Sequence, residues 1–375
     1  MHRHLCSILV VATLSVLVLP IANYIVKRST APIQIDISNV LFDTDLFKSF
    51  VSWPLYFVGV SIDPSQAVIG KQGWIFLGDA HALTLSEERS RTPESNAEFF
   101  RGLDETIKGL SDFFSKMGVS HTVLLIGPNK SSIYPENLPD WARLPKERYA
   151  PHNSYRQVVN PESLLIEAKK RFSTPLYFRT DTHWNANGAG IAFRALVERL
   201  KQLDPLLQLP DDSVFDEVSI AEIKGGDLSR FLRISDRVND QFPFMKYLQQ
   251  QPETIKVDFD TGHLIFDKAP PSFVKPLRVL SEGAFNQRRV LWLQDSFAAI
   301  LAPLSAMMFS DVVHWSWVDA LQDGARLSEL VRAYKPEIVI FTVVERSLRN
   351  PACSRPSAKA LRYCLHVPSD IKNMH

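Results

Sequence analysis

The chain has 375 residues, of which 45% are hydrophobic and 22% are charged, and its formal net charge is +1. This composition is ordinary for a folded globular protein and excludes a largely disordered chain. The near-neutral charge, without a stripe of Lys and Arg between aromatic residues, provides no basic field for binding phosphate backbones. We therefore expect no nucleic acid among the partners.

The chain begins with a long apolar segment. Residues 5–26 contain no charged residue, and as a helix they would cross a bilayer core of roughly 30 Å. The segment that follows matches a signal-peptidase site poorly, so we expect an uncleaved membrane anchor over residues 1–30 and a linker over 31–65. A cleaved signal peptide is the alternative, and basic residues on both sides of the span leave its orientation open.

From about residue 95 the sequence alternates amphipathic segments with short apolar runs. Apolar residues that recur every three or four positions predict helices, and runs that are apolar throughout predict buried strands. The predicted helices cover residues 95–118, 161–172, 185–203, 296–309 and 325–334, and the predicted strands cover 121–128, 175–180, 288–294, 311–317 and 336–344. Such an alternation indicates a parallel sheet covered on both faces, which is a three-layer α/β fold.

Residues 204–287 interrupt this alternation. Within them, residues 256–267 predict a hairpin, and residues 225–232 predict a tight turn into a short helix. We interpret the segment as a mixed insertion that decorates the sheet of one domain over residues 66–350. Near the start of that domain, "GKQGWIFLGD" predicts a structural hairpin rather than a phosphate cradle, because no helix pattern follows it.

The C-terminal tail, residues 351–375, contains two cysteines. Cys353 and Cys364 flank a short polar loop, and a disulfide between them would close a ring of ordinary size. Such a bond indicates an oxidising compartment, whereas two unrelated thiols are the alternative. We expect the disulfide, and with it a protein body outside the cytoplasm.

Polar residues follow nearly every predicted strand. Ligands of open α/β sheets bind beyond the carboxyl ends of the strands, so these positions are the first candidates for a site. In chain order they are Asn129 and Lys130, Asp181 and His183, Asp295 and Ser296, Asp319, and Glu345 and Arg346.

Three of these residues have the chemistry of an activated hydroxyl. Ser296 can act as a nucleophile, His183 as its base, and Asp181 as the acid that orients the base. Ser296 also lies at a predicted turn from strand to helix, where free backbone N–H groups can stabilise an oxyanion. The alternatives are that Asp181 and Ser296 are ordinary helix caps and that His183 is an ordinary surface histidine. No cluster with zinc spacing is present in the sequence, so we predict neither a metal nor a cofactor.

Six segments together are similar to one known family. They are "VIGKQGWIFLGD", "GPNKSSIYPENLP", "TDTHWNANGAG", "LQDSFA", "KPEIVIFTVVERSL" and, more weakly, "GGDLSRFL". In this order they resemble the alginate O-acetyltransferase family of the AlgJ and AlgX type, whose fold is SGNH-hydrolase-like, a flavodoxin-like parallel sheet. We expect the AlgJ-type architecture, because the chain ends soon after the last segment and leaves no room for a carbohydrate-binding domain.

The resemblance implies a function and a cellular setting. Ser296, His183 and Asp181 would form a triad that accepts an acetyl group and passes it to a hydroxyl of an exopolysaccharide. The body would be periplasmic and tethered to the inner membrane, and a membrane-bound O-acyltransferase would deliver the acetyl group. A glycan acetyl esterase and a non-catalytic polysaccharide-binding scaffold are the alternatives. Gln294 departs from the family pattern, because a Gly-Asp-Ser block has glycine there, and this puts the oxyanion geometry in question.

Further residues near the expected site are candidates for contact with substrate. Arg346 is a candidate for an anionic sugar or the oxyanion, with a salt bridge to Glu345 as its alternative. Asn129 and Lys130 are likewise candidates for contact with the substrate or the oxyanion, with contacts inside the protein as the alternative. The aromatic candidates for stacking on sugar rings, each with burial in the core as its alternative, are Tyr134, Trp184, Trp315 and Trp317.

Overall fold

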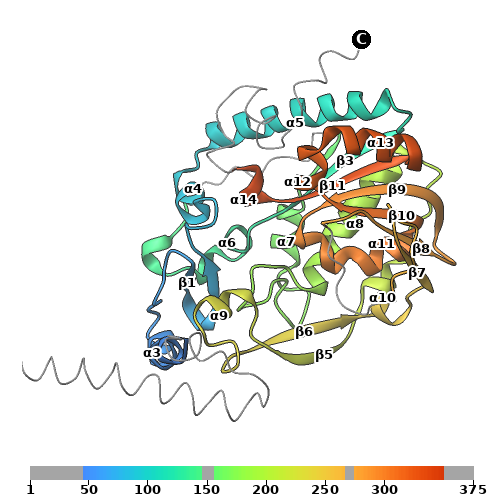
Figure 1. Ribbon diagram of the computed structural model, residues 1–375. Helices are drawn as coiled ribbons and strands as arrows, with labels where there is room; N and C mark the ends of the chain where they lie inside the picture. The colour runs from blue at the N-terminus through green and yellow to red at the C-terminus, as the bar shows by residue number, and fades with distance from the viewer. Residues whose placement is uncertain (1–44, 146–155, 267–273, 350–375) are drawn as a thin grey trace, which may run out of the picture.

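Apolar runs of β-branched and aromatic residues form a central sheet of seven strands in the order β4-β3-β11-β9-β10-β8-β7. The computed structural model describes residues 45–145, 156–266 and 274–349 (Figure 1). The five parallel strands are β3 (His121–Gly127), β4 (Val158–Val159), β9 (Asn286–Gln294), β10 (Phe309–Ser316) and β11 (Ile338–Val344). The predicted three-layer α/β fold is confirmed, as is each of the predicted strands after residue 287.

The sheet is mixed rather than purely parallel. At one edge β10 pairs antiparallel with β8 (Leu277–Ser281), which pairs antiparallel with β7 (Thr254–Asp258). Side chains of β8 alternate between buried and half-buried positions, which suits an antiparallel edge with one more exposed face. Both strands come from the predicted insertion, so this segment extends the sheet instead of only decorating it.

Helices cover both faces of the sheet, as Figure 1 shows. One face packs against α5 (Pro93–Ser115), α12 (Trp317–Gln322) and α13 (Gly324–Tyr334), and the other against α7 (Glu162–Ala168), α8 (Ala186–Leu203) and α11 (Ala302–Met308). Successive side chains of a strand point to opposite faces, and β9 follows this rule. Trp292 lies in the core beside α8, whereas Leu291 and Leu293 lie in the core beside α5.

Local sequence sets the helix starts and stops. α5 begins with a capping box between Thr92 and Ser95, and Gly118 follows its end with φ +89°. Asn185 is the N-cap of α8. The predicted helix over residues 296–309 is split into a 3₁₀ helix η5 (Ser296–Leu301) and α11, because Pro303 is tolerated only in the first turn of a helix.

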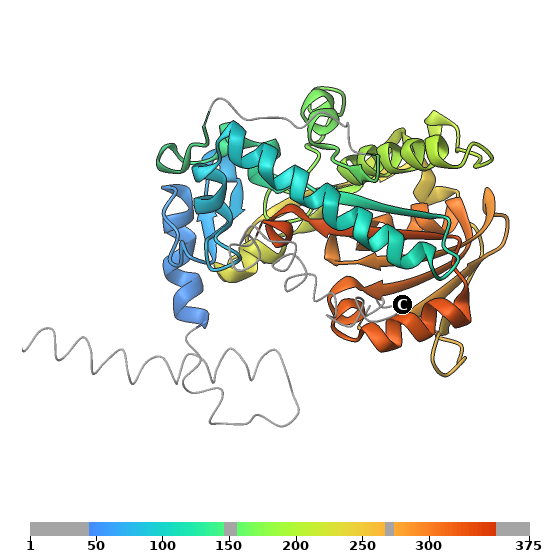
Figure 2. The same cartoon turned by 90° about the horizontal axis from the view of Figure 1, so that it is seen from above.

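A smaller group of elements packs beside the sheet (Figure 2). The predicted glycine-rich hairpin is formed by β1 (Ala67–Ile69) and β2 (Ile75–Leu77). Its core is shared with α9 (Asp227–Phe231) of the insertion. α3 (Asp45–Phe57) and α4 (Thr84–Ser90) lie beside it in Figure 2. Since α3 falls within the predicted linker over residues 31–65, part of that linker is helical.

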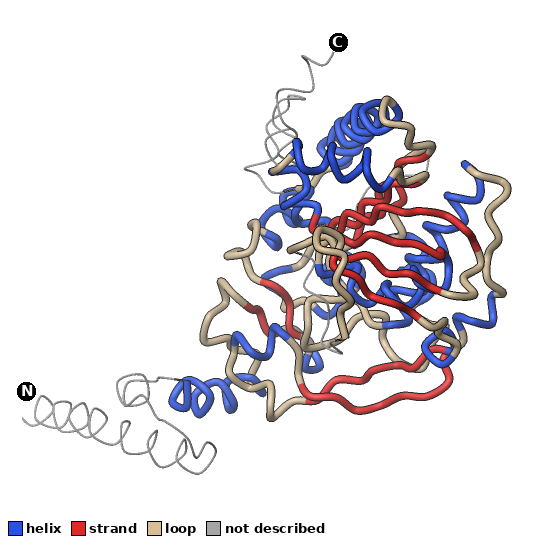
Figure 3. The backbone as a smooth tube through the Cα atoms, turned by 45° about the vertical axis from the view of Figure 1, so that its right-hand side comes forward, coloured by secondary structure: helices blue, strands red, loops and turns tan. Residues whose placement is uncertain are grey.

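The rest of the insertion forms a two-stranded ribbon and a short helix. The ribbon, β5 (Glu217–Lys224) with β6 (Asn239–Met245), is antiparallel and stands apart from the main sheet (Figure 3). α10 (Lys246–Gln249) leads from it toward β7. The predicted hairpin over 256–267 is present as β7 with a single bridge between Val257 and Leu264.

Several predictions fall on parts of the chain outside the described residues. These are the membrane anchor over 1–30, the tail over 351–375 and the pair Cys353 and Cys364. Within residues 45–145, 156–266 and 274–349, no helix has both the length and the apolar character that a membrane crossing requires.

Candidate active site

Ser296, His183 and Asp181 meet at the carboxyl edge of the sheet. His183 Nε2 lies 2.9 Å from Ser296 Oγ, and His183 Nδ1 lies 2.6 Å from Asp181 Oδ1. Because a carboxylate only accepts hydrogen bonds, Nδ1 carries a proton and Nε2 presents its lone pair to the serine hydroxyl. Ser296 is exposed to solvent, so a substrate can reach its Oγ.

Asp295 fixes the turn that carries Ser296. One oxygen of its carboxylate accepts the N–H of Phe297 at 2.9 Å, and the other accepts the N–H of Val344 at 2.7 Å. Burial raises the pKa of Asp295, and these two backbone N–H groups act in the opposite direction. The carboxylate therefore connects the end of β9 to the end of β11. Ser296 is the first residue of a short helix, and the first N–H groups of a helix have no acceptor within it.

The segment before His183 was predicted as a strand of the sheet, and this prediction is wrong. Tyr177 makes only an isolated bridge with Trp184, and the edge position of the sheet belongs to β4. Side chains satisfy the backbone groups that a ladder would pair. Lys130 Nζ donates to the carbonyls of Phe178, Arg179 and Asp181 at 3.1, 3.0 and 2.7 Å.

A carboxylate from the insertion holds the same segment from its other side. Asp240 on β6 accepts the N–H of Arg179 at 2.9 Å and both the N–H and the hydroxyl of Thr180, at 2.7 and 2.6 Å. Lys130 and Asp240 therefore fix the turn that presents Asp181 and His183. This is a positioning role, and it replaces the substrate contact that we predicted for Lys130.

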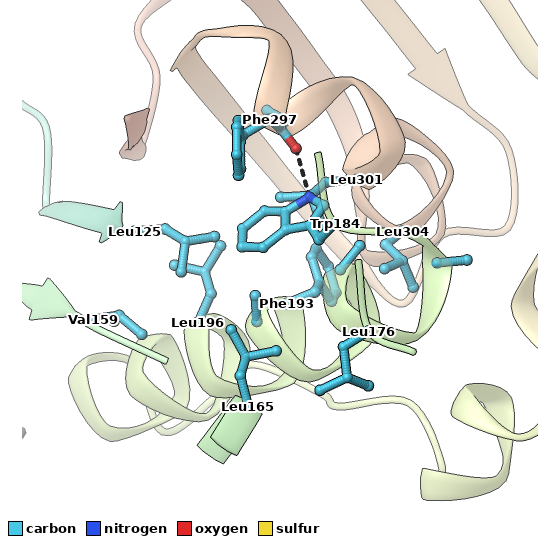
Figure 4. Packing of buried hydrophobic residues seen from close by; sticks show 14 of the residues in the cluster. Leu125, Val159, Leu165, Leu176, Trp184, Phe193, Leu196, Phe297, Leu301 and Leu304 are labelled. Atoms are coloured by element: carbon cyan, nitrogen blue, oxygen red, sulfur yellow. Dashed lines mark hydrogen bonds between the residues drawn. The ribbon is translucent and has the colours of Figure 1, made fainter. Parts of the chain in front are cut away.

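Trp184 is hydrogen-bonded to Phe297 in the buried core, as Figure 4 shows. Its indole Nε1 donates to the carbonyl of Phe297 at 2.9 Å, and the two rings pack edge to face at 5.2 Å. Trp184 follows His183 in the chain and Phe297 follows Ser296, so this contact fixes the separation of His183 and Ser296. The tryptophan is fully buried, which rules out the predicted stacking on a sugar ring.

Asp181 is held as a carboxylate. Burial alone would raise its pKa, but hydrogen bonds from the His183 ring and from the backbone N–H groups of Asp227 and His183 outweigh burial and lower the pKa. Gly226 permits this arrangement, because a Cβ at that position would lie 2.3 Å from Asp181 Cβ and Oδ2. The glycine is thus required by the close approach of its backbone to the acid.

Asp227 lies in the segment "GGDLSRFL" but is not among the site residues predicted from the sequence. Its carboxylate accepts the N–H and the hydroxyl of Thr182 at 2.7 and 2.6 Å. Asp181, His183 and Asp227 bring ligand atoms within 4.8 Å of one another, as a metal site would. Hydrogen bonds among these residues and Thr182 already use those atoms, which favours acid and base chemistry.

Most of the remaining predicted contacts lie in the core. The hydroxyl of Tyr134 accepts the N–H of Leu176 at 2.8 Å, and the side-chain amide of Asn129 donates to Glu88 at 2.7 Å. Both side chains are over 90% buried, so neither is open to a substrate. Trp315 and Trp317 are likewise buried, at 1% and 8% exposure, so the structure assigns these aromatic residues to packing.

Arg346 differs from these residues. The predicted alternative, a salt bridge with Glu345, does not form, because Glu345 pairs with Arg91 at 2.6 Å and with Arg349 at 3.3 Å. The Arg346 guanidinium lies over the Phe297 ring, 5.5 Å from its centre, and makes no hydrogen bond or ion pair with any residue that the structure describes. Burial lowers the pKa of Arg346, while the carboxylate of Asp295 acts against this.

Gln294 does not disturb the space in front of Ser296. It is 1% exposed, and its Oε1 lies 3.0 Å from Nδ1 of His314 on β10. The side chain is therefore directed into the core, and the departure from the Gly-Asp-Ser pattern is absorbed by a buried hydrogen bond. Burial lowers the pKa of His314 to about 3, so the imidazole is neutral and donates from Nδ1.

Gly226→Ala tests the close approach to Asp181. The added Cβ must displace the acid, and a misplacement of about 1 Å at a catalytic group can lower turnover by ~10²-fold, so we expect a loss of that order in a folded protein. Gly109→Ala in α5 is the matched control, since a Cβ there meets nothing within 4 Å and should stabilise the helix by about 1 kcal/mol. Turnover of an acetyl ester and thermal unfolding of both variants provide the comparison, and equal activity of the two would contradict this role of Gly226.

Lys130 makes a pH-dependent contribution to stability. Burial lowers its pKa to about 8, whereas an exposed lysine has a pKa of about 10.4. Between these values the unfolded chain binds the extra proton, so the contribution of Lys130 to the free energy of unfolding rises with pH. Urea unfolding of the wild type and of Lys130→Met at pH 7.5 and about 9.5 should show a difference that increases with pH. A difference that stays constant or shrinks would contradict the buried amine.

Comparison with known proteins agrees with this fold. Residues 67–274 match the family described as SGNH hydrolase-like domain, acetyltransferase AlgX, a range that contains Asp181, His183 and Asp227 and ends before Ser296. The probable alginate O-acetylase AlgJ of Pseudomonas syringae pv. tomato is 26% identical over 193 residues, which cover 49% of this chain and 46% of the relative. The corresponding protein of Pseudomonas putida is 26% identical over 211 residues, covering 54% and 52%. The chain thus spans about half the length of these curated relatives.

A solved structure gives the same picture of the fold. A DHHW family protein from Eubacterium siraeum superposes with a TM-score of 0.50 at 16% identity, covering 81% of this chain and 97% of that one. The O-acetyltransferase domain of Pseudomonas putida AlgJ has 21% identity and a TM-score of 0.42, with 80% and 98% covered. Since the family match extends over more than half of its residues, the chain belongs to the family of SGNH hydrolase-like domains of acetyltransferase AlgX.

Proposed function

We propose that this protein is a polysaccharide O-acetyltransferase that carries the acetyl group on Ser296. The main support is a pair of contacts made by the His183 ring. Its Nε2 lies 2.9 Å from Ser296 Oγ, and its Nδ1 lies 2.6 Å from Asp181 Oδ1. In this arrangement an imidazole can remove the hydroxyl proton while a carboxylate fixes its tautomer. The curated relatives, named probable alginate O-acetylases, support an acidic polysaccharide as the acceptor.

Acetyl loading begins when Ser296 Oγ attacks the carbonyl carbon of an acetyl donor. His183 Nε2 takes the hydroxyl proton as the new C–O bond forms, and the carbonyl π electrons move onto oxygen. Collapse of the tetrahedral intermediate breaks the bond to the leaving group, which takes the proton from Nε2. Ser296 is then an acetyl ester, and the imidazole is neutral again.

Acetyl transfer repeats these steps with a sugar hydroxyl as the nucleophile. The hydroxyl gives its proton to His183 Nε2 and attacks the ester carbonyl, and Ser296 Oγ leaves with that proton. Asp181 remains ionised throughout, because the hydrogen bonds that lower its pKa are made to the carboxylate. Water in place of the sugar would make the protein an acetyl esterase, which is the alternative enzymatic function.

Two groups beside Ser296 suit the negative charges of this reaction. The Ser296 N–H opens η5 and is suited to the oxyanion, because the first N–H groups of a helix lack helical acceptors. Arg346 has no ion-pair partner among the described residues, and a guanidinium binds carboxylates in a bidentate manner. We assign Arg346 to the carboxylate of an acidic sugar.

The proposal extends to the setting of the enzyme. The uncharged apolar residues 5–26 support a single-pass anchor in the inner membrane, with the catalytic domain in the periplasm. A membrane-bound O-acyltransferase would then bring acetyl groups to Ser296 from the membrane. This part of the proposal rests on the sequence alone.

Replacing the nucleophile or the base tests the covalent step. Ser296→Ala and His183→Ala should each lower turnover of an aryl acetate by at least ~10²-fold, and intact-protein mass spectrometry should find one acetyl adduct on the wild type and none on Ser296→Ala. Ser115→Ala, at an exposed position of α5, is the control and should behave as wild type. An adduct on Ser296→Ala would exclude this nucleophile, and acetylated uronic acid oligosaccharides among the products would separate transfer from hydrolysis.

Arg346→Gln separates acceptor binding from chemistry. Loss of the guanidinium should raise the KM for an acidic oligosaccharide acceptor by about 10-fold, as expected for a lost charge-assisted contact, and should change turnover of a small aryl acetate by less than about 3-fold. Arg332→Gln, at an exposed position of α13, is the matched control. Equal loss in both assays would instead assign Arg346 to the oxyanion.

A further inference from the structure

A second carboxylate lies on the Nδ1 side of His183. Asp227 Oδ2 is 3.9 Å from His183 Nδ1, and the hydroxyl of Thr182 lies between them. Thr182 Oγ1 is 3.2 Å from Nδ1 and 2.6 Å from Asp227 Oδ2. The imidazole therefore has two routes to a negative charge, one direct to Asp181 and one through a hydroxyl to Asp227.

The direction of each hydrogen bond in the second route follows from the atoms. A carboxylate only accepts, so the Thr182 hydroxyl donates its single hydrogen to Asp227. Its lone pair is then available to the Nδ1–H of His183, which donates mainly to Asp181 at 2.6 Å and more weakly to Thr182 at 3.2 Å. A hydroxyl polarised by a carboxylate is a stronger acceptor than an isolated one.

The two acids are locked together by their backbones. The N–H of Asp227 donates to Asp181 Oδ2 at 2.9 Å, and the N–H of Thr182 donates to Asp227 Oδ1 at 2.7 Å. Each carboxylate thus accepts a backbone hydrogen from the segment that carries the other. Because like charges repel, such a pair is most stable when a cation lies beside it.

Cations do face this pair. The charge of Arg346 interacts with Asp227 and Asp181, and the buried amine of Lys130 interacts with both of them and with Asp240. The imidazolium that forms on His183 during each half of the reaction would be the cation closest to the pair, since it is hydrogen-bonded to one acid and linked through Thr182 to the other.

We propose that Asp227, acting through Thr182, is a second carboxylate that stabilises protonated His183 during acetyl transfer. This rests on the proposed function and adds a positioning residue to it. No proton moves to Asp227, because Nδ1 keeps its hydrogen while Nε2 takes the proton of Ser296 or of the sugar hydroxyl. Asp227 lowers the energy of the imidazolium by its charge and by holding Thr182, and it therefore partly replaces Asp181 when that acid is removed.

A double-mutant cycle tests the shared role of the two acids. Asp227→Asn keeps an oxygen for the Thr182 N–H but loses the charge, so we expect kcat to fall about 10-fold with KM within 2-fold. In the Asp181→Asn background the same change should lower kcat by about 10²-fold, because no acid then remains for the imidazolium. Effects that simply multiply would overturn the proposal.

Thr182 distinguishes a positioning role from a structural one. Thr182→Ser keeps the hydroxyl and should retain kcat within about 3-fold, whereas Thr182→Val keeps the shape and the backbone N–H and should lose about as much as Asp227→Asn. Wild-type activity in Thr182→Val, with an unchanged melting temperature, would overturn the route through the hydroxyl. Wild-type enzyme treated with EDTA should remain active, and its inactivation would show that the cluster holds a metal instead. Failure of the proposed function would be seen separately, as an acetyl adduct on Ser296→Ala.

Discussion

The active-site geometry depends on the hydrogen bond from the Trp184 indole to the carbonyl of Phe297. His183 and Ser296, the proposed base and nucleophile, are 113 residues apart in the chain, and no ladder of the sheet joins their backbones. The indole N–H and the packed rings hold the neighbours of His183 and Ser296 together inside the buried core. If the two segments separated, the buried indole N–H would lose its acceptor. Because a buried N–H without an acceptor costs free energy, this bond opposes their separation.

The charges of the site are arranged around this contact. Asp181, Asp227 and Asp295 accept backbone N–H groups from three different elements, which spreads the cost of burying negative charge. Arg346 and Lys130 supply the nearby positive charge. Lys130 is saturated by three carbonyl oxygens, so it shapes the site without entering the reaction, whereas Arg346 has donors left for a ligand. This difference could not be inferred from two basic residues that both follow a strand.

The sequence was informative where local patterns decide the structure. The helical periodicity before residue 118 and the apolar runs of β3, β9, β10 and β11 predicted the layers. Ser296, His183 and Asp181 lie within hydrogen-bond distance of one another in the structure, although no strand immediately precedes Asp181. The sequence failed where side chains replace the ladder: residues 175–180 resemble a strand, but Lys130 and Asp240 pair their backbone groups. It also failed for Trp184 and Tyr134, because residue type alone does not show whether an aromatic side chain faces a ligand or packs in the core.

Different interactions therefore position Ser296 and the pair Asp181 and His183. Ser296 follows a strand whose hydrogen bonds belong to the sheet, so its position is set by the fold as a whole. Asp181 and His183 follow a turn held by single side chains and by Gly226 and Asp227 of the insertion. A single substitution in the insertion can thus displace Asp181 and His183 while the sheet and Ser296 remain in place, which makes residues 204–287 part of the proposed catalytic site rather than an addition to it.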